Sequence, residues 1–575
     1  MPETFDGSAI ETRPSDEGVP RPVLPPLRVA LLGTNIQPRW RRKIIAEVAA
    51  SDDCQLILVI AGRPSTTPGR SGHPDSRRGP IGRLYRWADR LLFRRGPDAL
   101  DLVDVGDLIG KLPALEVRFT DGGESIEEAD VDRIRAYNPD VILCLGPEPR
   151  GRRVARLARF GVWAYRFGDA GASGVEPTGI GEVLGGRPST TVSLNLIEAG
   201  PAGEERILYL ATLKTHRLSA CRHGDHLGGV ASEFVGRELN RLRRGGSLAP
   251  RPGFVAPGGR SDGVTGDAET TRLIARFGIR LAAEGAHRAL YQDQWVLAYS
   301  TRGSWDGHRP DLSTMRLLAP PPDRFWADPF PVIIDGVNYV YFEDYPYQTR
   351  KGHVSVFEVD DRGQAGRPRK ALECDYHLSY PFVFSWGGGL YMIPETTAVG
   401  EVQLFRCSGA PDRWEFDRTL IRGVRAADVT LAEHDGRWWL FACIPAEGAH
   451  NDVEELHLFH SDSPLGPWRA HRGNPVKSDV GSARPAGHLY RRDGTWYRPA
   501  QDCTMGYGHS IVLNRVENWD LGRYEETPSG RIDPGWAPGV ERTHTFNALG
   551  NLFVGDARVS RSRLFPGKKS GGLVR

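Results

Sequence analysis

The sequence has no apolar run that approaches the roughly 18 residues of a membrane-spanning helix. Its N-terminal stretch, up to residue 26, is acidic and proline-rich without an apolar core, a pattern typical neither of a signal peptide nor of a membrane anchor. The seven cysteines are scattered without a Cys-x-x-Cys pair, which indicates a reducing compartment and shows no disulfide framework or zinc site. We therefore expect a cytoplasmic protein with no transmembrane segment.

An excess of charge of one sign is also missing. The 74 Lys and Arg residues nearly balance the 72 Asp and Glu residues, so the net charge is +2. This balance gives no electrostatic reason to expect nucleic acid as a partner. Gly33-Thr34-Asn35 lacks the Gly-x-Gly-x-x-Gly fingerprint of dinucleotide binding, and no pattern indicates another cofactor or a metal site. The sequence does not decide the oligomeric state.

The first half of the chain has the pattern of an α/β domain. A short apolar strand at residues 28–32, a helical pattern at 41–50 and a second strand at 55–60 predict the β-loop-α-β opening of an open parallel sheet. A Gly/Pro/Ser/Arg-rich insertion at 63–79 and a basic amphipathic segment at 82–95 follow. Such a segment touches a membrane surface or partner in some proteins. More often it packs its apolar face on its own domain, and packing is the prediction here.

Later strands of this half resemble the successive landmarks of the formyltransferase fold over residues 28–245. They are Asp140–Gly146, Gly161–Arg166, Gly181–Leu184 and Ser193–Ile197. The resemblance implies a catalytic Asn and His where this chain has Ala164 and Arg166. Without the amide that polarises a formyl carbonyl and the imidazole that moves the proton, formyl transfer is not expected. A formyltransferase-like or other sugar-modifying transferase is the third functional alternative.

The second half of the chain has a repeat. Turn pairs lie about 50 residues apart between apolar runs, a period typical of propellers. They are Asp335-Gly336, Gly387 to Gly389, Asp435-Gly436, Asp493-Gly494 and Gly550-Asn551. Five hairpins predict a five-bladed β-propeller, which the strand at 294–300 is expected to close. The predicted organisation is a disordered tail (1–27), the α/β domain (28–245), a linker (246–267), a helix and strand connector (268–318) and the propeller (319–575).

In a propeller the residue that opens each hairpin faces the shared axis. These positions hold Asp328, Tyr380, Asp428, Pro485 and His544, and the second strands add Glu343 and Glu395. We predict catalytic roles for Asp328, Asp428 and Glu395, because paired carboxylates provide the acid and base of glycoside chemistry. The predicted substrate-binding residues are Trp326, Tyr380, Arg484, His544 and Gln501. For Trp326 the alternative is packing between blades.

Two resemblances bear on this half. Trp326–Phe330, Tyr380–Phe384 and Leu458–Trp468 look like the five-bladed propellers of family 43 glycoside hydrolases. More narrowly, Ser482–Gly487 with Tyr497–Asp502 resembles the N-terminal domain of plant glucosamine inositolphosphorylceramide transferases. The hydrolase resemblance implies that Asp328 is the general base, that Tyr380 replaces an Asp that tunes the acid, and that Asp428 stands near the acid position.

The sequence thus predicts a carbohydrate-active protein that processes a glycoside through carboxylates in the propeller channel. The hydrolase resemblance implies inversion, with carboxylates about 6.5–9.5 Å apart. Carboxylates on opposite sides of the ring, or buried in ion pairs, would argue against that chemistry. The alternative is a non-catalytic protein that binds a glycan or a glycolipid headgroup. In either case a glycan or sugar-containing small molecule is the expected partner, and the sugar and linkage stay open.

Overall fold

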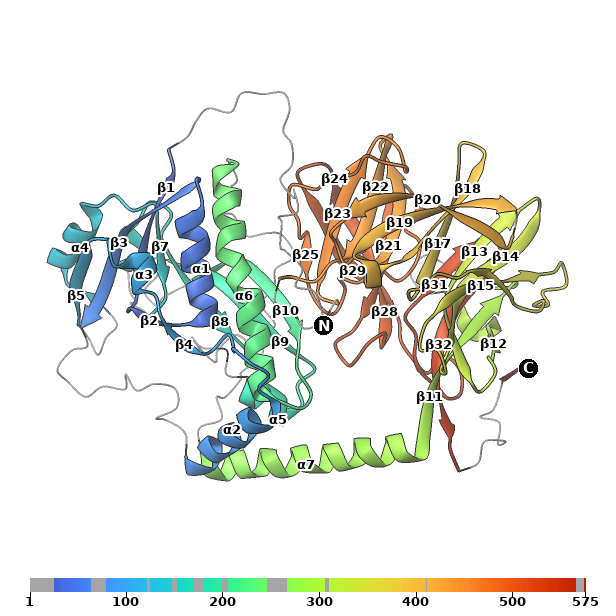
Figure 1. The fold of residues 1–575 in the computed structure, drawn as a ribbon, viewed down its shortest axis with the longest axis horizontal. Coiled ribbons are helices and arrows are strands. Elements are labelled where there is room, and N and C mark those ends of the chain that lie inside the picture. Colours follow the sequence, from blue (N-terminus) through green and yellow to red (C-terminus); the bar gives the residue numbers. More distant parts are fainter. Residues whose placement is uncertain are drawn as a thin grey trace. The chain divides into compact units, whose positions relative to one another are not determined.

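The chain folds as two compact units in a computed structural model (Figure 1). The α/β unit comprises residues 20–281 and 446–450, and the propeller unit comprises residues 1–19, 282–445 and 451–575. The structure describes residues 25–63, 79–120, 125–146, 153–168, 177, 179–198, 205–245, 266–305, 310–409, 411–447, 449, 451, 453–564 and 573–574. The predicted disordered tail (1–27) and linker (246–267) lie almost entirely outside these ranges.

The α/β unit is built on a mixed sheet with strand order β10-β9-β8-β7-β1-β3-β5-β6. The central strands β5, β3, β1, β7 and β8 run parallel, whereas β6, β9 and β10 pair antiparallel. The strands are β1 (Leu27–Leu32), β3 (Cys54–Arg63), β5 (Ala114–Thr120), β6 (Ser125–Ile126), β7 (Val141–Cys144), β8 (Val162–Phe167), β9 (Ser189–Ile197) and β10 (Glu205–Lys214). A separate pair joins β2 (Ile36–Pro38) and β4 (Leu102–Asp104). The predicted α/β fold class is confirmed.

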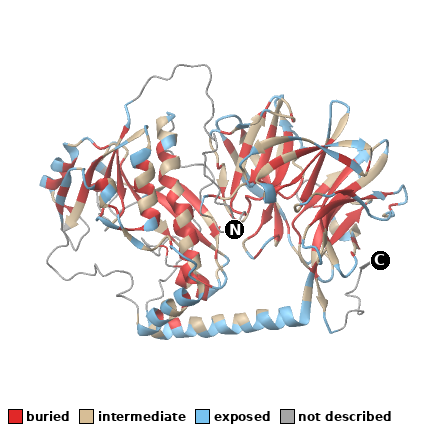
Figure 2. Cartoon of the chain, in the orientation of Figure 1, coloured by how far each residue is buried: buried red, intermediate tan, exposed pale blue. Residues whose placement is uncertain are grey.

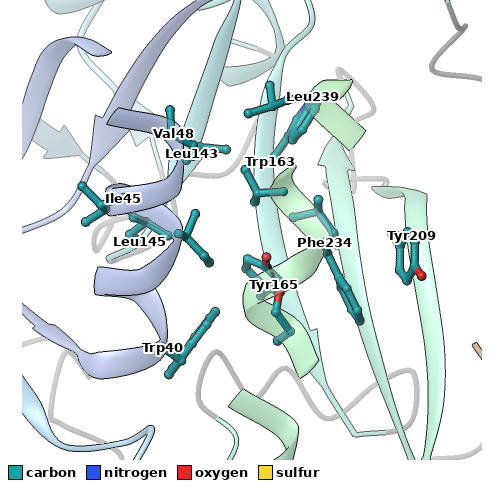
Figure 3. Packing of buried hydrophobic residues seen from close by; sticks show 14 of the residues in the cluster. Trp40, Ile45, Val48, Leu143, Leu145, Trp163, Tyr165, Tyr209, Phe234 and Leu239 are labelled. Carbon is teal, nitrogen blue, oxygen red and sulfur yellow. Dashed lines mark hydrogen bonds between the residues drawn. The ribbon is translucent and has the colours of Figure 1, made fainter. Parts of the chain in front are cut away.

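Alternate residues of the central strands enter two hydrophobic cores, as the twofold period of a strand requires. On β1, Val29 and Leu31 enter the core under α1 and α6, and Ala30 and Leu32 enter the core under α4. Figure 3 shows the first core, in which the ring of Trp40 meets the edge of Tyr165 at 5.0 Å between centroids. The helices are α1 (Arg39–Ala50), α2 (Pro80–Phe93), α3 (Gly106–Ile109), α4 (Glu128–Arg135), α5 (Ile180–Gly185), α6 (Ala220–Arg243) and the 3-10 turn η2 (Val154–Arg156). The formyltransferase resemblance stays a prediction.

Helix α7 (Asp267–Leu290) crosses the boundary between the units, and Thr270 is its one residue that is fully buried among those described. Figure 2 shows the contrast between this helix, which is largely exposed, and the strands of both units, which carry most of the buried residues. Among the helices that the structure describes, none combines the length and apolar character needed to cross a membrane.

The propeller unit consists of five blades, as the sequence predicted, and their strands pair antiparallel except for β12 with β33 in the fifth. The first has β13 (Arg324–Ile334), β14 (Val337–Pro346), β15 (His353–Val359) and β16 (Arg369–Leu372). The second has β17 (Ser379–Trp386), β18 (Gly389–Glu395), the 3-10 turn η4 (Thr397–Val399), β19 (Glu401–Gly409) and β20 (Arg413–Arg422). The third has β21 (Ala427–His434), β22 (Arg437–Cys443), β23 (Glu455–Ser461), β24 (Arg469–Ala470) and β25 (Lys477–Ser478). The fourth has β26 (Tyr490–Arg492), β27 (Thr495–Asp502), β28 (Ser510–Trp519) and β29 (Tyr524–Ile532).

The fifth blade closes the ring with strands from both ends of the unit. It contains β30 (Val540–Arg542), β31 (Phe546–Leu549), β32 (Leu552–Ser562), β11 (Tyr291–Ser300), the 3-10 turn η3 (Leu312–Thr314), β12 (Arg316–Leu318) and β33 (Leu573–Val574). Strand β11 pairs with β32 along its whole length, from Tyr291 opposite Ser562 to Ser300 opposite Phe553. The predicted closure by the strand before the propeller is therefore confirmed.

The Asp-Gly turns take the backbone form that their sequence favours. Asp335 and Gly336 have φ of 50° and 80°, and Asp435 and Gly436 have φ of 50° and 69°. Two successive positive φ angles are the signature of the tight turn that matches the twist of a hairpin. These Asp side chains have a local turn role, as expected.

Candidate functional site

Three consecutive blades open with the same distortion. Asp328, Tyr380 and Asp428 have φ of 52°, 42° and 53°, a left-handed conformation that is uncommon for residues other than glycine. At each of them the strand register shifts, so each residue is the extra one of a β-bulge. Bulges re-aim a side chain and cluster next to functional sites. The equivalent positions predicted from the repeat therefore share one geometry.

The amide of each bulged residue donates to a carboxylate. The amide of Asp328 donates to Oδ2 of Asp556 over 3.1 Å, and that of Tyr380 donates to Oδ2 of Asp328 over 3.3 Å. The amide of Asp428 donates to Oε2 of Glu395, also over 3.3 Å. Each of these carboxylates comes from the preceding blade, so they also hold neighbouring blades together.

Arg484 joins two of the predicted catalytic carboxylates. Its Nε lies 2.6 Å from Oδ2 of Asp428, and its Nη2 lies 3.2 Å from Oδ1 of Asp428 and 3.2 Å from Oε2 of Glu395. Gln501 donates its amide to Oδ2 of Asp428 over 2.7 Å. Burial raises the pKa of Asp428 against the opposing effect of Arg484, and Glu395 and Asp328 raise it further. The predicted residues Asp428, Glu395, Arg484 and Gln501 are thus brought together, in a buried ion pair.

His544 joins the remaining predicted carboxylate to one that the sequence did not single out. Its Nε2 lies 3.2 Å from Oδ1 of Asp328, and its Nδ1 lies 2.9 Å from Oδ2 of Asp556. Burial opposes charge on the ring, but Asp556 and Asp328 raise the pKa of His544 well above its usual value. Burial likewise disfavours ionised Asp328, yet His544 and the Thr545 hydroxyl at 2.7 Å hold its pKa below the usual range. The ring of His544 thus lies between two carboxylates that favour its protonated form.

Glu343 is the carboxyl group with the weakest charge compensation in this region. Its Oε1 lies 3.5 Å from Nε2 of His377, whose Nδ1 accepts a bond from the Gly352 amide over 2.9 Å. Burial raises the pKa of Glu343 well above its usual value, and the charge of Asp328 adds to this effect. The pKa values of Glu343 and Asp328 are thus displaced in opposite directions. We name Asp328, Glu343, Glu395, Asp428, Arg484, His544 and Asp556 the channel cluster.

Aromatic rings lie above the buried charges. Tyr507 is 38% exposed, and its ring centroid lies 5.1 Å from the guanidinium carbon of Arg484, which is 5% exposed. The ring centroid of His544 lies 5.3 Å from that of Tyr507 and 4.2 Å from that of Trp295. We call Tyr507, which is exposed, and Trp295, which is half-buried, the rim of the site; Arg484 and His544, which these rings contact, are buried.

Two predicted substrate-binding residues have other surroundings. Trp326 packs against Phe342 at 5.3 Å inside a hydrophobic cluster, so the alternative of packing between blades describes it. Tyr380 is fully buried, and its hydroxyl lies 2.9 Å from the Thr430 hydroxyl and accepts a bond from the Gly487 amide over 2.7 Å. The ring of Tyr380 therefore joins blades and is not part of the rim.

Sequence reasoning missed Asp556, His377, Tyr507 and Trp295, and left Glu343 outside the predicted site. Glu343 and Glu395 stand at equivalent places in successive blades, so the repeat held the signal for Glu343. Of the other four, Asp556 lies within β32 and Trp295 within β11, whereas His377 and Tyr507 lie in loops, and the period aligns none of these positions.

Asp328, His544 and Asp556 also have the spacing of a metal site, with one ligand atom of each within 4.8 Å of the others. However, the two ring nitrogens of His544 face different carboxylates, and one metal ion takes only one of them. The protonated ring supplies the positive charge that an ion would supply, so the ion pair accounts for this geometry.

Two other regions do not extend the site. A surface hollow of about 690 Å³ is lined by residues that include Asp502 and Arg531, but by none of the predicted site residues. In the α/β unit, Arg166 forms an ion pair with Glu205, which also accepts a bond from Asn195 over 2.7 Å. The polar groups at the place of the implied formyltransferase catalytic residues are therefore engaged with one another.

The comparisons with known proteins concern the propeller. Residues 305–531 match the family model described as Glucosamine inositolphosphorylceramide transferase 1, N-terminal. Glucosamine inositolphosphorylceramide transferase 1 of Oryza sativa subsp. japonica is 36% identical over 210 residues, which are 36% of this chain and 28% of that protein. The Arabidopsis thaliana protein of the same name is 32% identical over 209 residues, 36% of this chain and 27% of that protein. The chain thus spans less than a third of the length of these relatives.

Solved structures with a matching region include carbohydrate-active enzymes. The catalytic domain of Coprinopsis cinerea GH62 alpha-L-arabinofuranosidase is 13% identical, covers 47% of this chain and 98% of that one, and has a TM-score of 0.33. Zg3597, a family 117 glycoside hydrolase of Zobellia galactanivorans, is 13% identical, and the match covers 47% of this chain and 90% of that one, with a TM-score of 0.30. The predicted resemblance is confirmed, because residues 305–531 match the family model of the N-terminal region of glucosamine inositolphosphorylceramide transferases.

Proposed function

We propose that the propeller binds a saccharide over the channel cluster, and that the charge of the cluster favours an amino sugar such as the glucosamine in the name of the relatives. The observation that carries this proposal is the pairing of an exposed aromatic ring, Tyr507, with the buried guanidinium of Arg484 beneath it. A ring face offers a sugar an apolar contact, and the charged groups of the channel cluster offer donors and acceptors to its hydroxyl groups.

The charge balance supports the amino sugar. Four carboxyl groups of the channel cluster share two cationic side chains, Arg484 and His544, and the fifth, Glu343, lies beside His377. Burial makes an excess of negative charge costly, and two of the carboxyl groups, Glu343 and Asp428, have raised pKa values for that reason. An ammonium group on the ligand would compensate this excess, so a charged amino sugar is favoured over its neutral analogue.

Binding ranks above hydrolysis because of the ion pairs. Asp428 and Glu395 both face Arg484, and Asp328 faces His544, so the predicted acid and base have partners before any substrate arrives. This is the outcome that the sequence interpretation named as contrary to inverting chemistry. Glycoside processing stays as a second candidate for a different reason. Asp328 and Glu343 have pKa values displaced in opposite directions, which is the pattern of a base and an acid.

The test of binding uses the exposed ring, because substitutions in the buried cluster disturb the fold. Glucosamine, N-acetylglucosamine and glucose are titrated by ligand-observed NMR against wild type, Tyr507→Ala and Tyr507→Phe. We expect Tyr507→Ala to weaken binding about tenfold, since an aromatic contact contributes roughly 0.5–1.5 kcal/mol beyond its buried area. Tyr507→Phe keeps the ring and should bind nearly as wild type does.

Phe416→Ala removes an aromatic ring that is 56% exposed on β20 and serves as the matched control. Equal binding of glucosamine by wild type and Tyr507→Ala would overturn the proposal, as would the absence of binding. For the second candidate, a glycan panel is scored for released sugar with wild type, Asp328→Asn and Glu343→Gln. Turnover that is lost in both variants while they keep the circular dichroism spectrum and the Tm of wild type would establish processing, whereas binding without turnover leaves a recognition module.

A further inference from the structure

Helix α2 (Pro80–Phe93) has one face that is firmly attached to the α/β unit. Tyr85 packs with the hydrophobic cluster of α5, and Asp89 accepts a bond from the Cys221 amide at the start of α6 over 2.6 Å. The amide of Ile81 donates to Oδ1 of Asp267 over 3.1 Å, which anchors the first turn. The helix is therefore held in a fixed orientation on its unit (Figure 1).

The opposite face of α2 is apolar and exposed. Leu84 and Trp87 are each 63% exposed, Leu91 is 70% exposed and Leu92 is 74% exposed. Residues three and four apart share one face of a helix, so Leu84, Trp87 and Leu91 form a continuous stripe. The prediction that this segment packs its apolar face on its own domain is therefore wrong for the stripe, because Tyr85 and Asp89 occupy the packed face instead.

A row of arginines borders the stripe. Arg83, Arg90 and Arg94 recur at intervals of seven and four residues along α2 and its C-terminal end, and all three are exposed. Trp87, Leu91, Arg90 and Arg94 also line a shallow surface hollow of about 530 Å³. Apolar side chains thus lie directly beside guanidinium groups on one exposed surface of α2 and its C-terminal end.

We propose that α2 lies on an anionic lipid bilayer, with Leu84, Trp87 and Leu91 in the boundary between headgroups and acyl chains. An exposed apolar stripe beside a basic row is the pattern of helices that lie in a membrane interface, and Trp prefers that depth. The exposed arginines carry the charge opposite to that of lipid phosphates, and one of them, Arg94, also pairs with Asp101 over 2.8 Å.

The experiment is cosedimentation of the full chain with large vesicles of phosphatidylcholine alone, or with anionic phosphatidylserine added. Wild type should pellet with the anionic vesicles, and binding should weaken as salt rises because the Debye length falls from about 8 Å at 0.15 M to about 3 Å at 1 M. Trp87→Glu with Leu91→Glu should weaken binding by at least about tenfold, since charge replaces the inserted side chains. Leu102→Glu, at a 59% exposed leucine on β4, is the matched control and should bind as wild type does.

A second variant, Arg90→Gln with Arg94→Gln, should lose the preference for anionic vesicles and much of the salt dependence. Circular dichroism and the Tm check that each variant is folded. Equal pelleting of wild type and the Trp87/Leu91 variant would overturn the proposal, as would wild type that does not bind anionic vesicles. If wild type self-associates through this face in analytical ultracentrifugation and does not bind vesicles, a second copy of the chain covers the stripe and the proposal is overturned.

Discussion

His223 in the α/β unit and His544 in the propeller unit are both almost completely buried, at 0% and 2% exposed, yet their pKa values are displaced in opposite directions. Nε2 of His223 lies 2.9 Å from the Thr190 hydroxyl, and its Nδ1 accepts from the His216 amide over 3.4 Å. Burial, with the neighbouring His226 and His216, lowers the pKa of His223 well below its usual value. His544 lies between two carboxylates, which overcome burial and raise its pKa.

The comparison teaches that burial alone does not decide charge. The sheet of the α/β unit surrounds His223 with a hydroxyl and a backbone amide, which satisfy the ring without charge. The ring of blades directs carboxylates from β13 and β32 at His544. A repeat that places one polar residue of each blade near a shared axis concentrates charge there, and the channel cluster is the consequence.

The largest expected effect tests whether the propeller depends on its buried charges. Arg484→Met leaves Asp428 and Glu395 buried without their cation, which should lower the free energy of unfolding by about 3–5 kcal/mol. Urea unfolding followed by hydrogen exchange measures this loss for the blades. The control is Arg422→Met, whose side chain is 78% exposed and pairs with Glu401, and it should cost about 0–1 kcal/mol. A similar loss of unfolding free energy in the two variants would show that the propeller does not depend on the buried charges of the channel cluster.

The two histidines predict opposite pH dependence in the two units. The unfolded pKa of histidine is about 6.5. The folded pKa of His544 lies above it, so the contribution of His544 is complete below that pH and is lost as the pH rises through the folded pKa. The folded pKa of His223 lies below it, so His223 costs stability as the pH falls below that value.

Each histidine changes the free energy of unfolding by at most about 1.4 kcal/mol per pH unit. Hydrogen exchange of the two units between pH 5 and pH 9 measures it, with His544→Gln and His223→Gln to isolate the contributions. Each variant should flatten the profile of its own unit and leave the other unchanged. If the stability of both units changed in the same direction with pH, the opposite roles of the two histidines would be contradicted.

The smallest effects are expected from removing one threonine hydroxyl near each of the two histidines. Thr545→Val removes the donor to Asp328, and because that acceptor is charged the loss should be about 1.5–3 kcal/mol. Thr190→Val removes a neutral partner of His223 and should cost about 0.5–1.5 kcal/mol. Thermal unfolding of both variants gives the ranking, and a larger cost for Thr190→Val would contradict it.

Much of the site followed from the repeat. Asp328, Tyr380 and Asp428 were found because each stands seven or eight residues before a turn, and the structure gives all three the same bulge. Asp556 and His377 were missed because their loops and strands differ from blade to blade. The packing predicted for the 82–95 segment was half wrong, since periodicity identifies an apolar face but does not say which face meets the domain.

The sequence by itself determined the two fold classes, the five blades, the closing strand and the positions that open each blade. These follow from local rules, because strand period, Asp-Gly turns and repeat length act between residues close in the chain. The tertiary structure alone decided which charges meet. Arg484 finds Asp428 and Glu395 across 56 and 89 residues, and His544 finds Asp328 across 216. Such pairs, and the displaced pKa values that they cause, depend on distances in space that no local pattern records.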